Sequence, residues 1–220
     1  LTMSSEGPQE RNPARRAFAA EFRDATHEER DEEKERAARY QLLPTGEWAN
    51  RVFIVGTLAD VETKPDNDDY AKGELQDPTG KFTIDAGEFQ LEEVAKMKEI
   101  ETPEFVAVTG KAISFPGDRG RISKIRVEKI TDVPPALYDH WVAEAAAQVI
   151  RRLKNFDNPD NDAAEKAAEV YGTDLDVYHQ SAIEAVEAVR EMILEEGTVN
   201  EDSPATTAEA DQTVPAEESD

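Results

Sequence analysis

The order of strand and helix patterns between Trp48 and Ile130 constrains the fold of this chain more than any other feature of the sequence. Alternating apolar and polar residues predict five strands in this stretch, with one short helix between the third and the fourth. The first strand, residues 50–61, is apolar on both faces and has Gly56 in its middle. A strand that serves both sides of a closed sheet must bend, and glycine allows the bend because it tolerates bulge dihedrals and close backbone approach. The sequence therefore predicts an α+β fold around a closed five-stranded sheet.

The second and third strands form a predicted hairpin around the turn Asp77-Pro78-Thr79-Gly80, because proline at the second turn position and glycine at the fourth favour a tight reversal. The predicted elements are strands at 70–76 and 82–86, a helix at 88–100 that can close one end of the sheet, strands at 105–113 and 121–130, and a loop at 114–120 between them. This order is typical of a five-stranded OB-fold β-barrel, whose loops commonly bind ligands.

The flanking segments differ from this middle part in composition. Residues 13–40 are rich in charge and contain only a short apolar face with Phe18 and Phe22, which favours a solvated helix or arm over a docking element. Downstream, Pro134 and Pro135 end the sheet pattern and helical periodicity begins. The expected organisation is disorder at 1–12, a charged N-terminal helix or arm at 13–47, the OB-fold at 48–132, a C-terminal helical region at 133–195 and a disordered acidic tail at 196–220.

The charge of the chain is strongly negative and evenly distributed. There are 49 acidic and 25 basic residues, which gives a formal net charge of −24. In an ordinary acidic protein the acid collects in one tail or block. A negative charge spread over the whole chain keeps a protein hydrated in concentrated salt. We therefore expect a halophilic source.

The residue types that usually carry catalysis are missing or badly spaced. The chain has no cysteine, and its three histidines lie far apart without a partner at metal-binding spacing. The acidic run 66–69 suggests a calcium loop, but the sixth position is Ala71 where such a loop needs glycine. There is no phosphate-binding, dinucleotide or nucleophile-elbow motif. We expect no enzymatic activity, no cofactor and no bound metal.

No apolar run in the sequence approaches the roughly 20 residues that a membrane helix requires. The basic N-terminal residues Arg11, Arg15 and Arg16 are not followed by an apolar stretch, as they would be in an export signal. We therefore expect neither a membrane span nor a cleaved signal, and a cytoplasmic, nucleoid-associated location.

Residues 111–129 reverse the sign of the charge, with six basic and two acidic side chains. Binding of single-stranded nucleic acid requires cations for phosphates and rings for bases, and Phe115 lies in this same window. The alternative is a solvated strand whose bases pair with neighbouring acids. Phe82 is assigned to the core and Trp48 to a plug at the end of the barrel. The predicted single-stranded DNA contacts are Tyr70, Lys72, Lys81, Lys111, Phe115, Arg119, Arg121, Lys124 and Arg126.

A helix predicted from about residue 136 to residue 156 carries an apolar stripe. This stripe fits either contact with a partner subunit or packing within the chain. If it serves assembly, Trp141 and Val149 are buried only in the complex. The residues assigned to partner binding are Tyr138, Trp141, Val142, Ala145, Val149 and Phe156.

The segments Trp48–Val61, Tyr70–Ala86 with its Leu75–Gly80 turn, Phe105–Ile113 and Arg121–Ile130 together resemble the OB-fold of replication protein A small subunits. With its Ala-rich helices and acidic composition, the chain is most similar to the haloarchaeal replication protein A-associated proteins.

This resemblance implies a non-catalytic subunit that binds single-stranded DNA jointly with a replication protein A large subunit, or another OB-fold subunit, in replication and repair. It implies a hetero-oligomer, with the helix at 136–156 in the place of the assembly helix. Two alternatives stay open: an OB-fold adaptor that contacts only protein, and an RNA-binding OB module of translation.

Overall fold

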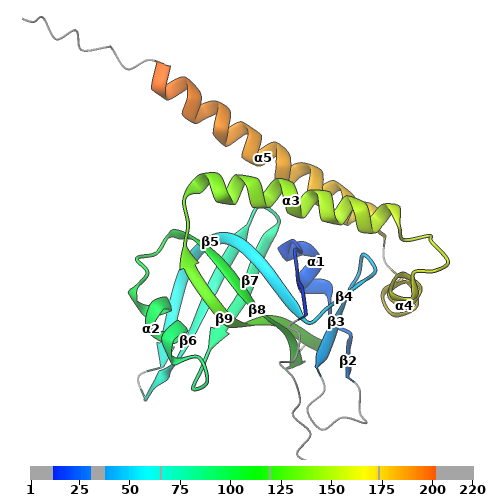
Figure 1. Ribbon diagram of the computed structural model, residues 1–220, viewed down its shortest axis with the longest axis horizontal. Helices are drawn as coiled ribbons and strands as arrows, with labels where there is room; N and C mark the ends of the chain where they lie inside the picture. The colour runs from blue at the N-terminus through cyan, green and yellow to red at the C-terminus, as the bar shows by residue number, and fades with distance from the viewer. Residues whose placement is uncertain (1–11, 31–37, 65, 119, 173, 202–220) are drawn as a thin grey trace, which may run out of the picture.

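The computed structural model describes residues 12–30, 38–64, 66–118, 120–172 and 174–201. Two groups of predictions fall outside these ranges: the contact assigned to Arg119, and the disorder expected at residues 1–11 and 202–220. In the described part, one C-terminal helix crosses a sheet-dominated domain, a second lies on that helix, and a small second sheet lies beside the domain (Figure 1). None of the described helices is both long enough and apolar enough to cross a membrane.

The central sheet closes on itself. The first long strand, β5, pairs antiparallel with β8 through Arg51–Leu58 and with β6 from Thr57 onward, and β7 pairs in parallel with β9. The strand order β5-β6-β7-β9-β8 therefore returns to β5. Its elements are β5 (Arg51–Lys64), β6 (Asn67–Asp77), β7 (Gly80–Ala86), α2 (Leu91–Glu99), β8 (Glu104–Gly117) and β9 (Gly120–Asp132).

The sheet has six strands, not the five expected. The additional strand is β1 (Ala14–Arg15), which pairs in parallel with Arg51 and Val52 of β5. The position of β1 follows from the length of β5. One edge of β5 pairs with β6 only from Thr57 onward, so the beginning of that edge is left for another strand. An unpaired strand edge readily accepts another strand, and here it pairs with β1.

Gly56 lies where two strands approach closely, as predicted. A Cβ atom at this position would collide with the backbone carbonyl of Gln76 on β6. The register of the β5–β6 pair then shifts between Leu58 and Asp60. The bend that lets β5 serve both sides of the sheet therefore depends on a residue without a side chain.

The interior of the closed sheet is filled by the inward side chains of all five long strands. Phe82 is buried among them, as predicted. At one end α2 inserts Val94 and Met97, and the Glu93 carboxylate on the same helix accepts a hydrogen bond from the Ile130 backbone N–H at 2.8 Å. The predicted short helix therefore does close one end of the sheet.

The N-terminal segment is not the charged helix that its composition suggested. It forms β1, a short helix and an outer sheet, in which β3 pairs with both β2 and β4. Phe18 and Phe22 are each 1% exposed, with rings 5.7 Å from Trp141 and 5.6 Å from Phe82. Burial of such a ring is worth roughly 1.5–3 kcal/mol, which outweighs the preference of the neighbouring charges for water. The elements are α1 (Ala19–Asp24), β2 (Glu28–Arg30), β3 (Arg39–Leu43) and β4 (Glu47–Ala49).

Trp48 also differs from its prediction. It lies on β4 in the outer sheet, half-buried, with its ring 6.0 Å from that of His27. It therefore packs against the N-terminal segment and does not plug an end of the central sheet.

The C-terminal region consists of α3 (Pro135–Lys154), α4 (Asp162–Tyr171) and α5 (Asp176–Glu201). In Figure 1, α3 crosses the closed sheet and α5 lies on α3 and continues past it. Because α5 ends at Glu201, residues 196–201 are helical where the sequence predicted the start of a disordered tail. The buried face of α5 is formed by Tyr178, Ala182, Ala185 and Val189, whereas Val186 and Ile193 are exposed.

The assignment of the α3 stripe to a partner subunit is wrong for five of its six residues. Trp141 is 1% exposed, and its indole N–H donates to the Phe53 backbone carbonyl at 3.0 Å. Because these side chains fill the space between the sheet and α5 within one chain, they are not available to another subunit. Phe156 is half-buried beyond the end of α3. The buried residues are Tyr138, Trp141, Val142, Ala145 and Val149.

Candidate nucleic-acid interface

The outer face of the closed sheet collects most of the predicted DNA contacts. Lys72 pairs across strands with Asp85, Asp85 with Arg126, and Arg126 with Lys111, so these four residues form one row over β6, β7, β9 and β8. Successive strand residues point to opposite sides, and the neighbours of these residues along each strand are buried in the interior. The predicted contacts on this outer face are Tyr70, Lys72, Lys81, Lys111, Phe115, Lys124 and Arg126.

Arg121 is not on this face. It pairs with Pro116 one position away from Phe115, and its guanidinium donates to the Ser114 hydroxyl at 2.6 Å and 2.8 Å and to the Ser114 carbonyl at 3.0 Å. Arg121 therefore lies on the opposite side of the β8–β9 hairpin from Phe115.

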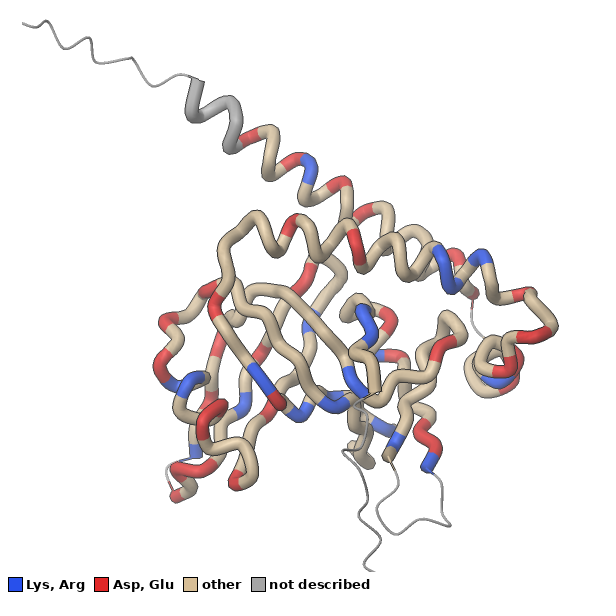
Figure 2. Tube along the Cα trace, in the orientation of Figure 1, with Lys and Arg blue, Asp and Glu red and all other residues tan. Residues whose placement is uncertain are grey.

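Most cations of the outer face are paired with carboxylates from other strands. Lys72 contacts Glu62 at 3.1 Å and Lys81 contacts Glu74 at 2.6 Å. Basic and acidic residues accordingly mix over the sheet and do not separate into large patches (Figure 2). The positive window seen in the sequence is thus largely compensated by acids that lie elsewhere in the chain. Among the described residues of that window, only Lys111 and Arg121 have no carboxylate partner.

Asp85 is the centre of this pairing. It is 1% exposed and accepts from Lys124 Nζ, from Arg126 Nε at 2.6 Å and from Arg126 Nη2 at 3.3 Å. The two cations cover the carboxylate, and the carboxylate fixes their positions. Arg126 Nη1 makes no hydrogen bond with any described residue and stays free to donate.

The β8–β9 hairpin presents an apolar platform. The predicted loop at 114–120 is instead a continuation of both strands, with Phe115 opposite Ile122. Pro116 is tolerated in β8 because β5 pairs with β8 only as far as Lys111, so no strand is paired with this edge of β8 at Pro116. Phe115 and Ile122 are 36% and 46% exposed, and Lys124 Nζ lies 5.0 Å from the centre of the Phe115 ring. This platform joins a ring and a cation, which suits a nucleobase and its phosphate.

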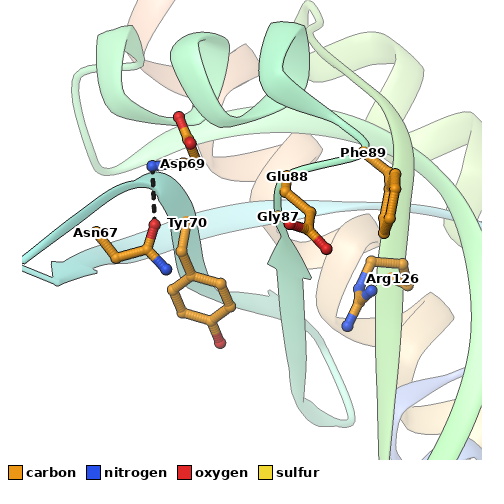
Figure 3. Close-up of a pocket in the computed structure, with 7 residues that line it drawn as sticks. All are labelled: Asn67, Asp69, Tyr70, Gly87, Glu88, Phe89 and Arg126. Carbon is orange, nitrogen blue, oxygen red and sulfur yellow. Dashed lines mark hydrogen bonds between the residues drawn. The ribbon is translucent and has the colours of Figure 1, made fainter.

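A pocket opens at the other end of the same face, beside the start of α2. It is lined by Asn67, Asp69, Tyr70, Glu88, Phe89 and Arg126 (Figure 3). Burial raises the pKa of the Tyr70 hydroxyl, and Lys64 Nζ lies 4.7 Å from the centre of its ring. Phe89 is 83% exposed.

Phe89 is not among the predicted contacts, because it falls inside the helix expected at 88–100, where an apolar residue is usually counted as core. Phe89 precedes Gln90, the N-cap of α2, and therefore lies outside the helical turns whose apolar face packs on the sheet.

No protein-family model and no curated protein matches the chain. Among solved structures, it is similar to a chain of the S. pombe Stn1–Ten1 complex, with a TM-score of 0.50 and 12% identity over 72% of this chain and 98% of that one. It is also similar to a chain of a replication protein A heterotrimer bound to single-stranded DNA, with a TM-score of 0.43 and 15% identity over 63% and 98%. A small single-stranded DNA-binding protein from Mycoplasma pneumoniae gives 0.31 and 15% over 37% and 91%.

The likeness to the Stn1–Ten1 chain extends beyond the closed sheet, because the match covers 72% of this chain. Together with the strand order, it shows that the chain has an OB-fold. At these identities the likeness defines the fold, and the role of the outer face has to be argued from its residues.

Proposed function

We propose that this chain is a non-catalytic accessory subunit of an archaeal, halophilic replication protein A complex that acts in the nucleoid during replication and repair. It binds single-stranded DNA jointly with an OB-fold partner subunit. The observation that carries the proposal is the Phe115–Ile122 platform with Lys124 at its edge, on the outer face of an OB-fold hairpin. OB-folds bind oligonucleotides with the face of their second and third strands and with loops that include the one between the fourth and fifth strands, which is the position of this hairpin.

In this mechanism a nucleobase stacks on Phe115 and Ile122, and phosphates contact Lys111 and Lys124. Stacking of one base is worth about 1–3 kcal/mol, and it neutralises no phosphate and so releases no counterions. Lys111 has no described carboxylate partner, whereas a phosphate at Lys124 would share its ammonium group with Asp85. At Lys72, Lys81 or Arg126 a phosphate would have to replace Glu62, Glu74 or Asp85. For one or two phosphate contacts, the slope of log K against log salt is only between about −0.7 and −1.4. Binding of this kind persists in concentrated salt.

Joint binding with a partner is supported by the exposed apolar side chains of α5. Outside its buried face this helix carries Ile183, Val186, Ile193 and Leu194, all at least 37% exposed. Large exposed apolar groups on a helix mark a contact surface. The first two similar structures are chains of complexes, the Stn1–Ten1 complex and a replication protein A heterotrimer. We propose α5 as the surface for the partner, in place of the buried α3 stripe.

The test is binding of fluorescent oligo-dT to the full chain, followed by anisotropy at several potassium chloride concentrations. Phe115→Ala removes the ring, so we expect affinity to fall by roughly 5- to 150-fold with an unchanged salt slope. Leu137→Ala is the matched control, because Leu137 is an exposed apolar residue on α3, away from the hairpin. Equal affinities of the two variants would refute the DNA-binding platform. Binding of a partner protein without DNA would favour the adaptor alternative, and tighter binding of structured RNA the translation alternative.

A further inference from the structure

The pocket beside α2 combines rings, one cation and acids in a way that differs from the hairpin platform. Tyr70 and Phe89 supply two aromatic side chains, and Arg126 of β9 supplies the cation. Figure 3 shows the Phe89 ring beside Arg126, and Tyr70 on the other side of the opening. The Phe89 ring is 83% exposed, so it is accessible to a ligand that enters the pocket.

Arg126 is pre-positioned for a ligand. Asp85 holds its Nε and Nη2 atoms, so the guanidinium cannot swing away, and Nη1 is left to donate. An arginine whose orientation is fixed before binding loses little side-chain entropy when a ligand arrives. Asp85 is thus a positioning residue for this pocket.

Acidic lining indicates which part of a nucleotide enters. Glu88 and Asp69 both line the pocket, and a phosphate beside them would be repelled. A nucleobase carries both donors and acceptors, so it can face a carboxylate and a guanidinium together. In Figure 3 the Glu88 carboxylate points toward Arg126, whereas that of Asp69 turns away. The described side chains of Glu88 and Arg126 form no ion pair with each other, which leaves the space between them open to a base.

Of the four bases, guanine matches this pair of groups best. Its O6 and N7 atoms accept from arginine, the commonest specific contact in protein–DNA recognition. Its N1–H and N2–H₂ groups are adjacent donors that one carboxylate can accept, whereas thymine offers a carboxylate a single N–H and no amino group.

We propose that this pocket is a nucleobase subsite at one end of the single-stranded DNA path, with a preference for guanine over thymine. The base stacks on Phe89, Arg126 Nη1 donates to its acceptor edge, and Glu88 accepts from its donor edge. The inference rests on the proposed function, since it assigns a position along the same DNA path.

The experiment measures binding of the full chain to oligo-dT in which a single guanine is moved from one end to the other. We expect guanine near one end to raise affinity about tenfold over the all-thymine strand, and guanine elsewhere to have no effect. Phe89→Ala abolishes this position-dependent gain. Leu91→Ala, which removes another exposed apolar side chain two residues away and outside the pocket, retains it.

Glu88→Gln separates a specific contact from a general one. Gln accepts through one oxygen only, so the guanine preference falls while affinity for all-thymine DNA is retained or rises, since a negative charge has been removed. If guanine has no position-dependent effect, or if Phe89→Ala and Leu91→Ala behave alike, the subsite is refuted. The proposed function then stands if Phe115→Ala still weakens oligo-dT binding. If the wild-type chain binds no strand at all, both proposals fail.

Discussion

Replacing Arg152 by methionine tests how the N-terminal segment is held to the rest of the molecule. The Arg152 side chain is 6% exposed, and Nη2 contacts the two oxygens of Glu21 at 2.7 Å and 3.0 Å. Its Nε donates to the Thr45 hydroxyl at 2.7 Å, and Nη1 contacts Glu47 at 3.2 Å and the Arg16 carbonyl at 3.1 Å. One guanidinium on α3 thereby joins α1 and the outer sheet.

The expected cost follows from what the substitution leaves behind. Methionine fills a similar volume but leaves the Glu21 carboxylate, which is 1% exposed, without its guanidinium partner. Removing one partner of a buried ion pair costs about 3–5 kcal/mol. Unfolding by urea, followed by tryptophan fluorescence at fixed potassium chloride, measures this loss. Arg151→Met is the matched control, because Arg151 is exposed and contacts only Gln148 among the described residues, so we expect a change below about 0.5 kcal/mol.

The loss should also depend on pH. Burial already raises the pKa of Glu21, and Arg152 is the main group that lowers it. In Arg152→Met the pKa of Glu21 in the folded state rises further. At a pH between the ordinary pKa of glutamate and this raised value, the folded variant keeps the Glu21 proton, whereas the unfolded chain has released it. The variant's stability therefore falls as pH rises, and the gap to the wild type narrows as pH is lowered. A loss below 1 kcal/mol at neutral pH, or a loss equal to that of Arg151→Met, would refute the reasoning.

Three further outcomes are expected from the same structure. Burial raises the pKa of Asp77 to about 6 from 3.8, so the contribution of Asp77 to the free energy of unfolding should increase by about 2 kcal/mol as the pH is lowered from 7.5 to 4. In urea titrations across this pH range, Asp77→Asn should lack this pH-dependent contribution. If the variant and the wild type showed the same dependence of stability on pH, the raised pKa of Asp77 would be contradicted. Trp141→Ala should destabilise the isolated chain by about 3–5 kcal/mol. If the substitution lowered stability only in the presence of a partner protein, the assignment of the α3 stripe to a partner subunit would be correct after all. With a net charge of −24, the melting temperature should rise between 0.1 and 2 M potassium chloride, and a flat curve would argue against charge repulsion as a destabilising force.

The central sheet could be predicted because its signals are local. Alternation marks each strand, the Asp77–Gly80 turn sets the hairpin, and Gly56 marks the close approach to β6. The packing of the N-terminal segment against the core could not be predicted in this way, because the ring that Phe18 contacts is Trp141, more than 100 residues away in the sequence. Nothing within the segment itself shows that such a partner exists.

The candidate site was predictable in position but not in charge. Counting basic residues along 111–129 located the face, yet the acid that neutralises Lys124 and Arg126 is Asp85, on a strand outside that window. Pairing across strands is decided by register, which a linear count does not contain. Phe89 was missed for a similar reason, since its exposure depends on where α2 begins.

Photo-crosslinking tests the central claim most directly, because it reports where DNA lies without depending on affinity. Oligo-dT carrying 5-iododeoxyuridine is irradiated with the full chain in molar potassium chloride, and the attached peptides are identified by mass spectrometry. The account predicts cross-links on the peptide that contains Phe115, with fewer in Phe115→Ala. Cross-links confined to α3–α5, with none on the β8–β9 hairpin, would contradict it.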